Sequence, residues 1–136
     1  MAKKTITITV PTIATAAGSV NGYGISPGGR LVSAVFSAVD ALAAHDTNKA
    51  SFVLKNLGSD GLGITDMLST AAVNSTAITG GSALTANAKR NLTLNGTIAN
   101  RDTNEGDRLK FIGTGAGTLA NTVTEGRVLL TFQRRS

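Results

Sequence analysis

Cysteine and tryptophan are absent from this chain of 136 residues, and proline occurs only twice. Without cysteine, neither a disulfide framework nor a thiolate metal site can form, so packing must stabilise the fold. No stretch of about 18 consecutive apolar residues is present, and we therefore expect no membrane partner. A chain of this length can bury about two-thirds of its unfolded surface, which is enough for one domain with its own core.

Residues that carry out chemistry are scarce as well. The chain has one histidine and eight acidic residues. His45 and the adjacent Asp46 fit a solvated loop better than a catalytic pair. Asp60 and Asp66 flank a glycine-rich loop, but their pattern lacks the spacing and ligand number of a calcium site. We expect no catalytic residue, no metal site, no cofactor and no small-molecule substrate, so that function resides in a binding surface.

A run of small residues at 113–118 resembles phosphate-binding loops only in its glycine content. It lacks the Lys followed by Ser or Thr of a P-loop, and it lacks the strand-to-helix context of a dinucleotide site. We interpret it as a hairpin or surface loop whose backbone approaches a neighbour closely, with a neighbouring subunit as one hypothesis.

What the sequence does contain is alternation of polar and branched apolar residues at a period of two. Residues 4–10 alternate in this way up to Pro11, and the last thirteen residues do much the same. This period predicts strands with one buried face. Further strands bounded by Gly, Asn or Asp turns are predicted at 19–25, 30–39, 49–56, 64–73, 89–95, 105–112 and 122–132. Residues 30–39 also fit helical spacing, but their β-branched side chains favour a strand.

About eight short strands, with at most one short helical turn near residues 80–90, predict an all-β protein. The architecture expected is a two-sheet antiparallel β-sandwich, either jelly-roll-like or immunoglobulin-like. Residues 13–136 form the sandwich domain, and residues 1–12 are either an N-terminal arm or its first strand. Four phenylalanines are expected to fill the space between the sheets: Phe36, Phe52, Phe111 and Phe132.

The formal net charge is +5, but Lys and Arg cluster only weakly along the chain. Lys3 and Lys4 begin it, and Arg134 and Arg135 end it, with Lys89 and Arg90 between them. A single tyrosine and no tryptophan provide little for base stacking, which disfavours nucleic acid as a partner. Such charge would equally attract an acidic protein surface.

Several segments in order resemble the small β-sandwich virion proteins that decorate or cement the capsids of tailed bacteriophages. They are Arg30-Leu-Val-Ser-Ala-Val, residues 52–63, Arg90-Asn-Leu-Thr-Leu, Glu105-Gly-Asp-Arg-Leu and residues 126–132. The resemblance extends over nearly the whole chain, and its motifs are compositional and positional.

The resemblance implies a non-enzymatic virion protein, assembled in the host cytoplasm, that binds the exterior of the capsid and stabilises it. Its partners would be the major capsid protein and itself, commonly as a homotrimer. The candidate interface consists of the basic ends and the alternating N-terminal segment, which can add a strand to an exposed sheet edge: Lys3, Lys4, Ile6, Ile8, Arg134 and Arg135. A receptor-binding or fibre-associated virion module and a nucleic-acid-binding protein are the alternatives.

Overall fold

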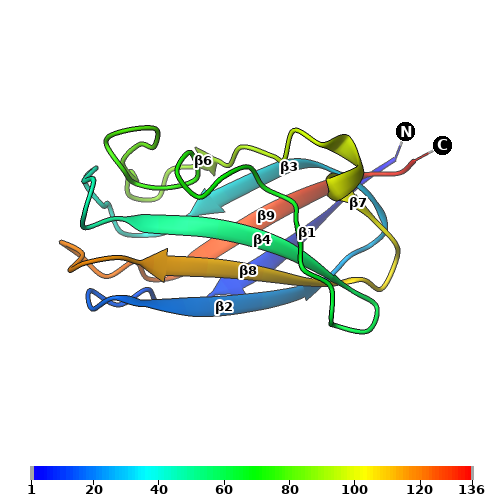
Figure 1. Ribbon diagram of the computed structural model, residues 1–136, viewed down its shortest axis with the longest axis horizontal. Coiled ribbons are helices and arrows are strands. Elements are labelled where there is room, and N and C mark those ends of the chain that lie inside the picture. Colours follow the sequence, from blue (N-terminus) through cyan, green and yellow to red (C-terminus); the bar gives the residue numbers. More distant parts are fainter. Residues whose placement is uncertain (1, 136) are drawn as a thin grey trace.

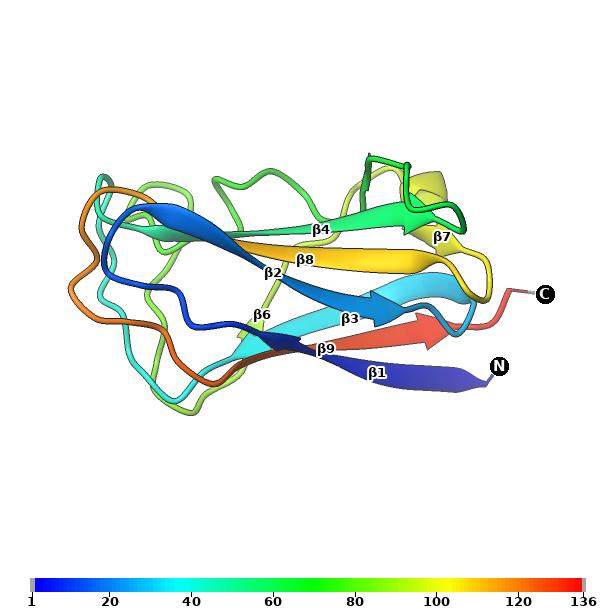
Figure 2. The ribbon, with the colours of Figure 1, turned by 90° about the horizontal axis from the view of Figure 1, so that it is seen from below.

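The computed structural model describes residues 2–135 and contains two facing antiparallel sheets (Figures 1 and 2). The first sheet contains β1 (Lys3–Val10), β9 (Gly126–Gln133) and β3 (Gly29–Ser37), with the short strands β6 (Arg90–Asn91) and β7 (Asp102–Thr103) along β3. The second contains β2 (Gly18–Ile25), β8 (Arg108–Gly115), β4 (Ala50–Gly58) and β5 (Thr65–Asp66). The predicted fold class is confirmed. Met1 and Ser136, which belong to the predicted arm and domain, lie outside the described residues.

The strand order decides between the two predicted architectures. The first and last strands, β1 and β9, are neighbours in one sheet, and the chain alternates between the sheets from β1 through β4. An immunoglobulin-type sandwich keeps its first two strands in the same sheet. The order β1-β9-β3-β6 facing β2-β8-β4-β5 is instead that of a jelly roll.

The core lies between the sheets and follows from the alternation in the sequence. Along β1, Thr5, Thr7 and Thr9 are exposed, whereas Ile8 and Val10 face the interior. All four phenylalanines are at most 1% exposed, which confirms their predicted role. Three of them stack across the sheets, with ring centroids 4.5 to 6.0 Å apart: Phe36, Phe52 and Phe111.

Along one side of the sandwich, β2 passes very close to β1. A Cβ atom at Gly22 would overlap the carbonyl oxygen of Thr9 and lie 2.8 Å from Cγ2 of Ile8. Only glycine permits this approach, because any larger residue would push the two strands apart. The two sheets are therefore in close contact along this side.

The long, irregular segment 59–107 covers the opposite side. Its backbone amides donate to the free edges of β4 and β3, from Met67 to Leu54 at 2.9 Å and from Leu92 to Ala34 at 2.9 Å. In Figure 1 most of this segment runs along the upper side, and the loop directly after β4 extends to the lower right. The edges of β3 and β4 are thus partly covered, whereas β1 and β2 each have a neighbouring strand in their sheet on one side only.

Three local predictions within this segment are wrong. The strands predicted at 64–73 and 89–95 shrink to the two-residue strands β5 and β6, and the helical turn predicted near 80–90 forms instead as a 3-10 turn, η1 (Ile98–Arg101). The apolar residues there are indeed buried, including Met67, Leu68 and Leu92. Their backbone, however, forms only single hydrogen bonds or isolated bridges with its neighbours, and therefore no long strands.

Candidate functional site: a basic hollow at the terminal end

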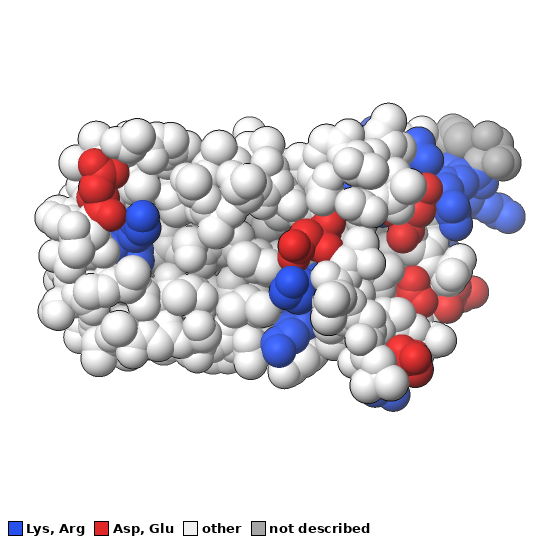
Figure 3. Space-filling model, in the orientation of Figure 1, with Lys and Arg blue, Asp and Glu red and all other residues white. Residues whose placement is uncertain are grey.

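The pairing of β1 with β9 brings the two ends of the chain together. In the antiparallel register Lys3 is opposite Gln133 and Lys4 is opposite Phe132. The backbone N–H of Arg134 then donates to the carbonyl oxygen of Ala2 over 3.1 Å. The basic pairs at the start and end of the sequence consequently lie at one end of the sandwich, where Figure 3 shows Lys and Arg side chains close to the chain terminus.

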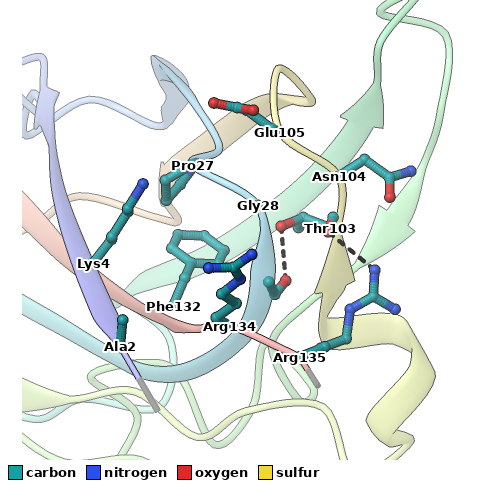
Figure 4. A pocket seen from close by; sticks show the side chains of 11 residues that line it. Ala2, Lys4, Pro27, Gly28, Thr103, Asn104, Glu105, Phe132, Arg134 and Arg135 are labelled. Carbon is teal, nitrogen blue, oxygen red and sulfur yellow. Dashed lines mark hydrogen bonds between the residues drawn. The ribbon is translucent and has the colours of Figure 1, made fainter.

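A hollow of about 700 Å³ opens at this end. Lys4, Arg134 and Arg135 approach it from the two terminal segments (Figure 4). Two loops and the inner ends of the strands complete the lining: Ala2, Pro27, Gly28, Gly29, Thr103, Asn104, Glu105 and Phe132. We call this site the basic hollow.

The wall of the basic hollow is fixed by a short chain of hydrogen bonds. Gly28 and Gly29 have φ angles of 88° and 106°, which L side chains rarely adopt and which the tight turn before β3 requires. The hydroxyl of Thr103 donates to the carbonyl of Gly29 over 2.8 Å. The hydroxyl of Ser26 lies 2.6 Å from that of Thr103, and it also accepts the amide of Gly28. Because Ser26 and Thr103 are both buried, the turn and the loop are firmly joined.

An ion-pair cluster supports the hollow from the side of β3. Asp102 accepts two hydrogen bonds from Arg30, with Nε to Oδ1 at 2.6 Å and Nη2 to Oδ2 at 3.1 Å. Arg135 lies 3.5 Å from the same carboxylate and donates to the carbonyl of Thr103. The hydrogen bond from Arg30 holds the pKa of Asp102 below its ordinary value, while the carboxylate raises the pKa of Arg30.

The remaining charges make the hollow a cationic site. Among the described residues, Lys4 and Arg134 form no ion pair, and Glu105 is the one acidic residue in the lining. Lys4 and Arg134 outnumber the single carboxylate of the lining, whereas Asp102 partly balances the charge of Arg135, so the hollow favours an anionic group. Arg and Lys suit carboxylates or phosphates through charge-assisted hydrogen bonds. The arrangement can bind an anion, but it combines no nucleophile with a base.

The residues predicted for an interface separate into two groups. Lys3, Lys4, Arg134 and Arg135 are exposed at the basic end. Ile8 is fully buried and Ile6 packs partly buried against the core, so the side chain of Ile8 is not available at the surface. Residues 3–10 form an edge strand of their own domain, paired throughout with β9.

Sequence reasoning missed Asp102, Thr103 and Glu105 as parts of this site. The turn at residues 26–29 was recognisable from its Pro and Gly, but its partner loop is more than 70 residues away in sequence. No local pattern marks that contact.

The other sequence candidates have separate partners within the chain. His45 is exposed, and its Nδ1 accepts the amides of Thr47 and Asn48 at 3.0 and 2.8 Å. Asp46 accepts the amide of Thr79 instead of orienting the imidazole ring. Hydrogen bonding to Thr79 lowers the pKa of Asp46.

Asp60 and Asp66 do not share a site. Asp60 accepts the amide of Leu62, and Asp66 pairs with Lys55 at 2.8 Å. Within residues 2–135, no three His, Asp or Glu side chains are grouped closely enough to hold a metal ion.

The glycine-rich run approaches a neighbour in its own chain. Thr118 donates its amide to Oδ1 of Asn48 at 3.0 Å, and a Cβ atom at Gly117 would overlap that side chain. Gly113 and Gly115, which lie in β8, face Ile13 in the interior.

The basic pair in the middle of the sequence belongs to the irregular segment. The guanidinium of Arg90 donates to the backbone carbonyls of Val73, Ser75 and Ser82. Burial lowers the pKa of Arg90. Its charge thus organises the segment around residues 73–82.

Comparison with known proteins gives one weak structural similarity. No family model matches this chain, and no curated protein matches its sequence. A solved structure of infectious bursal disease virus, Gx strain, contains a chain that aligns with 97% of this one at 9% sequence identity and a TM-score of 0.46. This chain spans 33% of the length of that chain. No helix in the described part is long and apolar enough to cross a membrane.

Proposed function

We propose that this chain is a decoration or cement protein that binds the outer surface of a tailed-bacteriophage capsid and stabilises it. The major capsid protein is the proposed partner, and the basic end makes the contact. The observation that carries the proposal is the meeting of Lys4, Arg134 and Arg135 around one hollow. Two segments far apart in the sequence form one cationic surface, which favours an acidic protein surface as the partner.

The edge of β1 beside the hollow supports the same role. The bond between Arg134 and Ala2 makes residues 2 and 134 a hydrogen-bonded pair. Because such pairs alternate along an antiparallel ladder, the amides and carbonyls of Lys3, Thr5 and Thr7 point away from β9. This edge can accept an extended segment of a partner, whose acidic side chains would then lie near the cations.

The resemblance to phage cement proteins is the ground for the finer parts of the proposal. These are a homotrimer as the assembled form, a place on the exterior of the virion, and assembly in the host cytoplasm.

Co-sedimentation with capsids tests the proposal. The shells are assembled from the major capsid protein encoded with this chain and lack the chain itself. We expect the wild-type chain to bind and to raise the temperature at which the shells dissociate. The double variant Lys4→Glu and Arg134→Glu should bind at least tenfold more weakly.

The matched control is Lys89→Glu with Arg127→Glu, which changes the net charge equally. Arg127 is opposite Thr9 and Ser37, at the other end of the first sheet, and Lys89 precedes β6 near that end. The proposal fails if the wild-type chain does not bind, or if the two double variants bind equally. Electron microscopy that places the chain on fibres would support the receptor-binding alternative instead.

A further inference from the structure

A second surface of different character lies on the outer face of the second sheet. Tyr23 and Ile25 of β2 are 64% and 57% exposed, and Leu62 and Ile64 in the loop after β4 are 80% and 79% exposed. With the half-buried Leu57, these residues form what we call the apolar patch. Isolated exposed apolar residues are common, but a cluster of this kind marks an interaction surface.

The apolar patch contains both a hollow and a projection. The hollow, of about 300 Å³, lies between β2 and β4 and is lined by Tyr23, Gly24, Ile25, Leu57, Gly61, Arg108 and Leu109. Leu62 follows the lining residue Gly61 in the sequence, and Ile64 comes two residues later. Both belong to the loop after β4, which projects beyond the end of that strand in Figure 1. An apolar cavity of about 150 Å³ can hold benzene, so this hollow can take a Leu or Ile side chain.

The projecting loop is held in one conformation by its own hydrogen bonds. The amide of Gly63 donates to the carbonyl of Leu57 at 2.7 Å, and the amide of Leu62 donates to Asp60 at 2.9 Å. The amide of Gly58 donates to Oδ1 of Asn56 at 2.9 Å. The exposed side chains are thus carried on an ordered scaffold, which lowers the entropic cost of inserting them into a partner.

The charges around the apolar patch carry both signs. Arg108 is opposite Ile25 and Lys110 is opposite Tyr23, while Asp60 lies in the projecting loop. Among the described residues, neither Arg108 nor Asp60 takes part in an ion pair. A surface that has an apolar projection beside an apolar hollow, and an acid beside a base, is complementary to itself.

From this self-complementarity we infer that the apolar patch binds a second copy of this chain. Leu62 and Ile64 of one copy enter the hollow between Tyr23 and Leu57 of the next, and Asp60 of one approaches Arg108 of the other. An interface between identical subunits requires either one patch that is complementary to itself or two different patches of the subunit that are complementary to each other. The inference rests on one part of the proposed function, the assembly of the chain with itself, and names the surface that makes this contact. The basic hollow has no part in it, so the capsid-binding test can succeed where the test of self-association fails.

Sedimentation equilibrium of the purified full chain tests the inference. The wild type should show a mass that rises with concentration above the 13.8 kDa of one chain. Leu62→Ser with Ile64→Ser should weaken association at least tenfold, and Tyr23→Ser with Ile25→Ser should do the same from the side of the hollow. These side chains are exposed, so thermal unfolding should stay close to that of the wild type.

Ile78→Ser is the matched control, because Ile78 is 64% exposed and lies outside the apolar patch. It should leave the association unchanged. A wild type that stays monomeric up to about 1 mM, or patch variants that associate as strongly as the wild type, would overturn the inference. Equal weakening by Ile78→Ser would overturn it as well.

Discussion

Asp102 connects three parts of the chain that are far apart in sequence. Its carboxylate pairs with Arg30 at the start of β3 and with Arg135 at the C-terminal end, and its neighbour Thr103 bonds to the turn before β3. Asp102 therefore positions Arg135 beside the basic hollow without contacting a bound anion itself. Its protonation should loosen that end of the sandwich.

The lowered pKa of Asp102 predicts a particular dependence of stability on pH. Because Arg30 depresses the folded-state pKa, the pair stabilises the fold above the unfolded-state pKa of about 3.9. That contribution is lost as the pH falls through the folded-state value. A double-mutant cycle of Asp102→Asn and Arg30→Gln, measured by urea unfolding, should give a favourable coupling at pH 7 that shrinks below about pH 4. A coupling that is the same at pH 7 and pH 2.5 would contradict this account.

The sequence predicts the positions of some residues in the fold but not of others. The alternation along residues 4–10 predicts that Ile6 and Ile8 share a face opposite the threonines, and that face is indeed the inner one. Including Ile8 in a surface contact conflicts with that same pattern. Asp102 and Thr103 offered no comparable signal, because their partners on the β3 side lie 72 to 77 residues away and Arg135 lies 32 to 33 residues away.

Among the elements, the irregular segment 59–107 depends on side-chain hydrogen bonds where strands would use ladders. Asn74, which is 1% exposed, joins two of its parts. Its Nδ2 donates to the carbonyl of Thr93 at 3.0 Å and its Oδ1 accepts the amide of Thr93 at 2.7 Å, while the carbonyl of Ser69 lies 3.4 Å from Nδ2. One amide side chain thus joins the part of the segment that lies along the edge of β4 to the part that lies along the edge of β3.

Replacing Asn74 with Ala should therefore destabilise the protein by about 1 to 3 kcal/mol, because a buried side chain loses its hydrogen bonds and the amide of Thr93 loses its partner. Chemical denaturation measures the change. Asn21→Ala, at an exposed position on β2, is the control and should change stability by less than about 0.5 kcal/mol. Equal effects of the two substitutions would show that the side chain of Asn74 is not important for holding this segment.

The long strands could be located from the sequence, whereas the short ones could not. The six long strands alternate over most of their length, with irregularities in β3 and β4, so the pattern located them to within a few residues. Between residues 64 and 95 the predicted strands contain the buried Leu68 and Leu92, but also the exposed Ile64. The pattern cannot tell whether a buried segment finds a neighbouring strand, and here Asn74 and Arg90 satisfy the backbone instead.

For the whole molecule, the jelly-roll order determines where the charge lies. Because the first and last strands are neighbours and antiparallel, both chain ends emerge at the same end of the sandwich. Sequence analysis identified the cations but could not bring them together, since it left the strand order open. The apolar patch lies on the outer face of the other sheet, and its Ile25 is two residues from Pro27 in the lining of the basic hollow.

The different chemistry of the two surfaces predicts how salt should affect the two contacts. Capsid binding through the basic end should show an association rate constant that falls steeply as salt rises, because the Debye length shortens from about 10 Å at 0.1 M to about 3 Å at 1 M. Self-association through the apolar patch should change much less, since burial of apolar surface is not screened. Surface-immobilised capsids with chain in solution measure the first, and sedimentation at the same salt concentrations measures the second.

Variants decide whether the basic end is the cause of that salt dependence. Lys4→Glu with Arg134→Glu should lower the association rate constant at low salt and remove most of its decrease with salt, while the dissociation rate changes less. Lys89→Glu with Arg127→Glu should keep a salt dependence close to that of the wild type, since those cations lie at the other end. If both pairs flatten the dependence equally, the net charge of the molecule attracts the partner. A steep dependence that only the first pair removes requires the cations that β1 and β9 bring together.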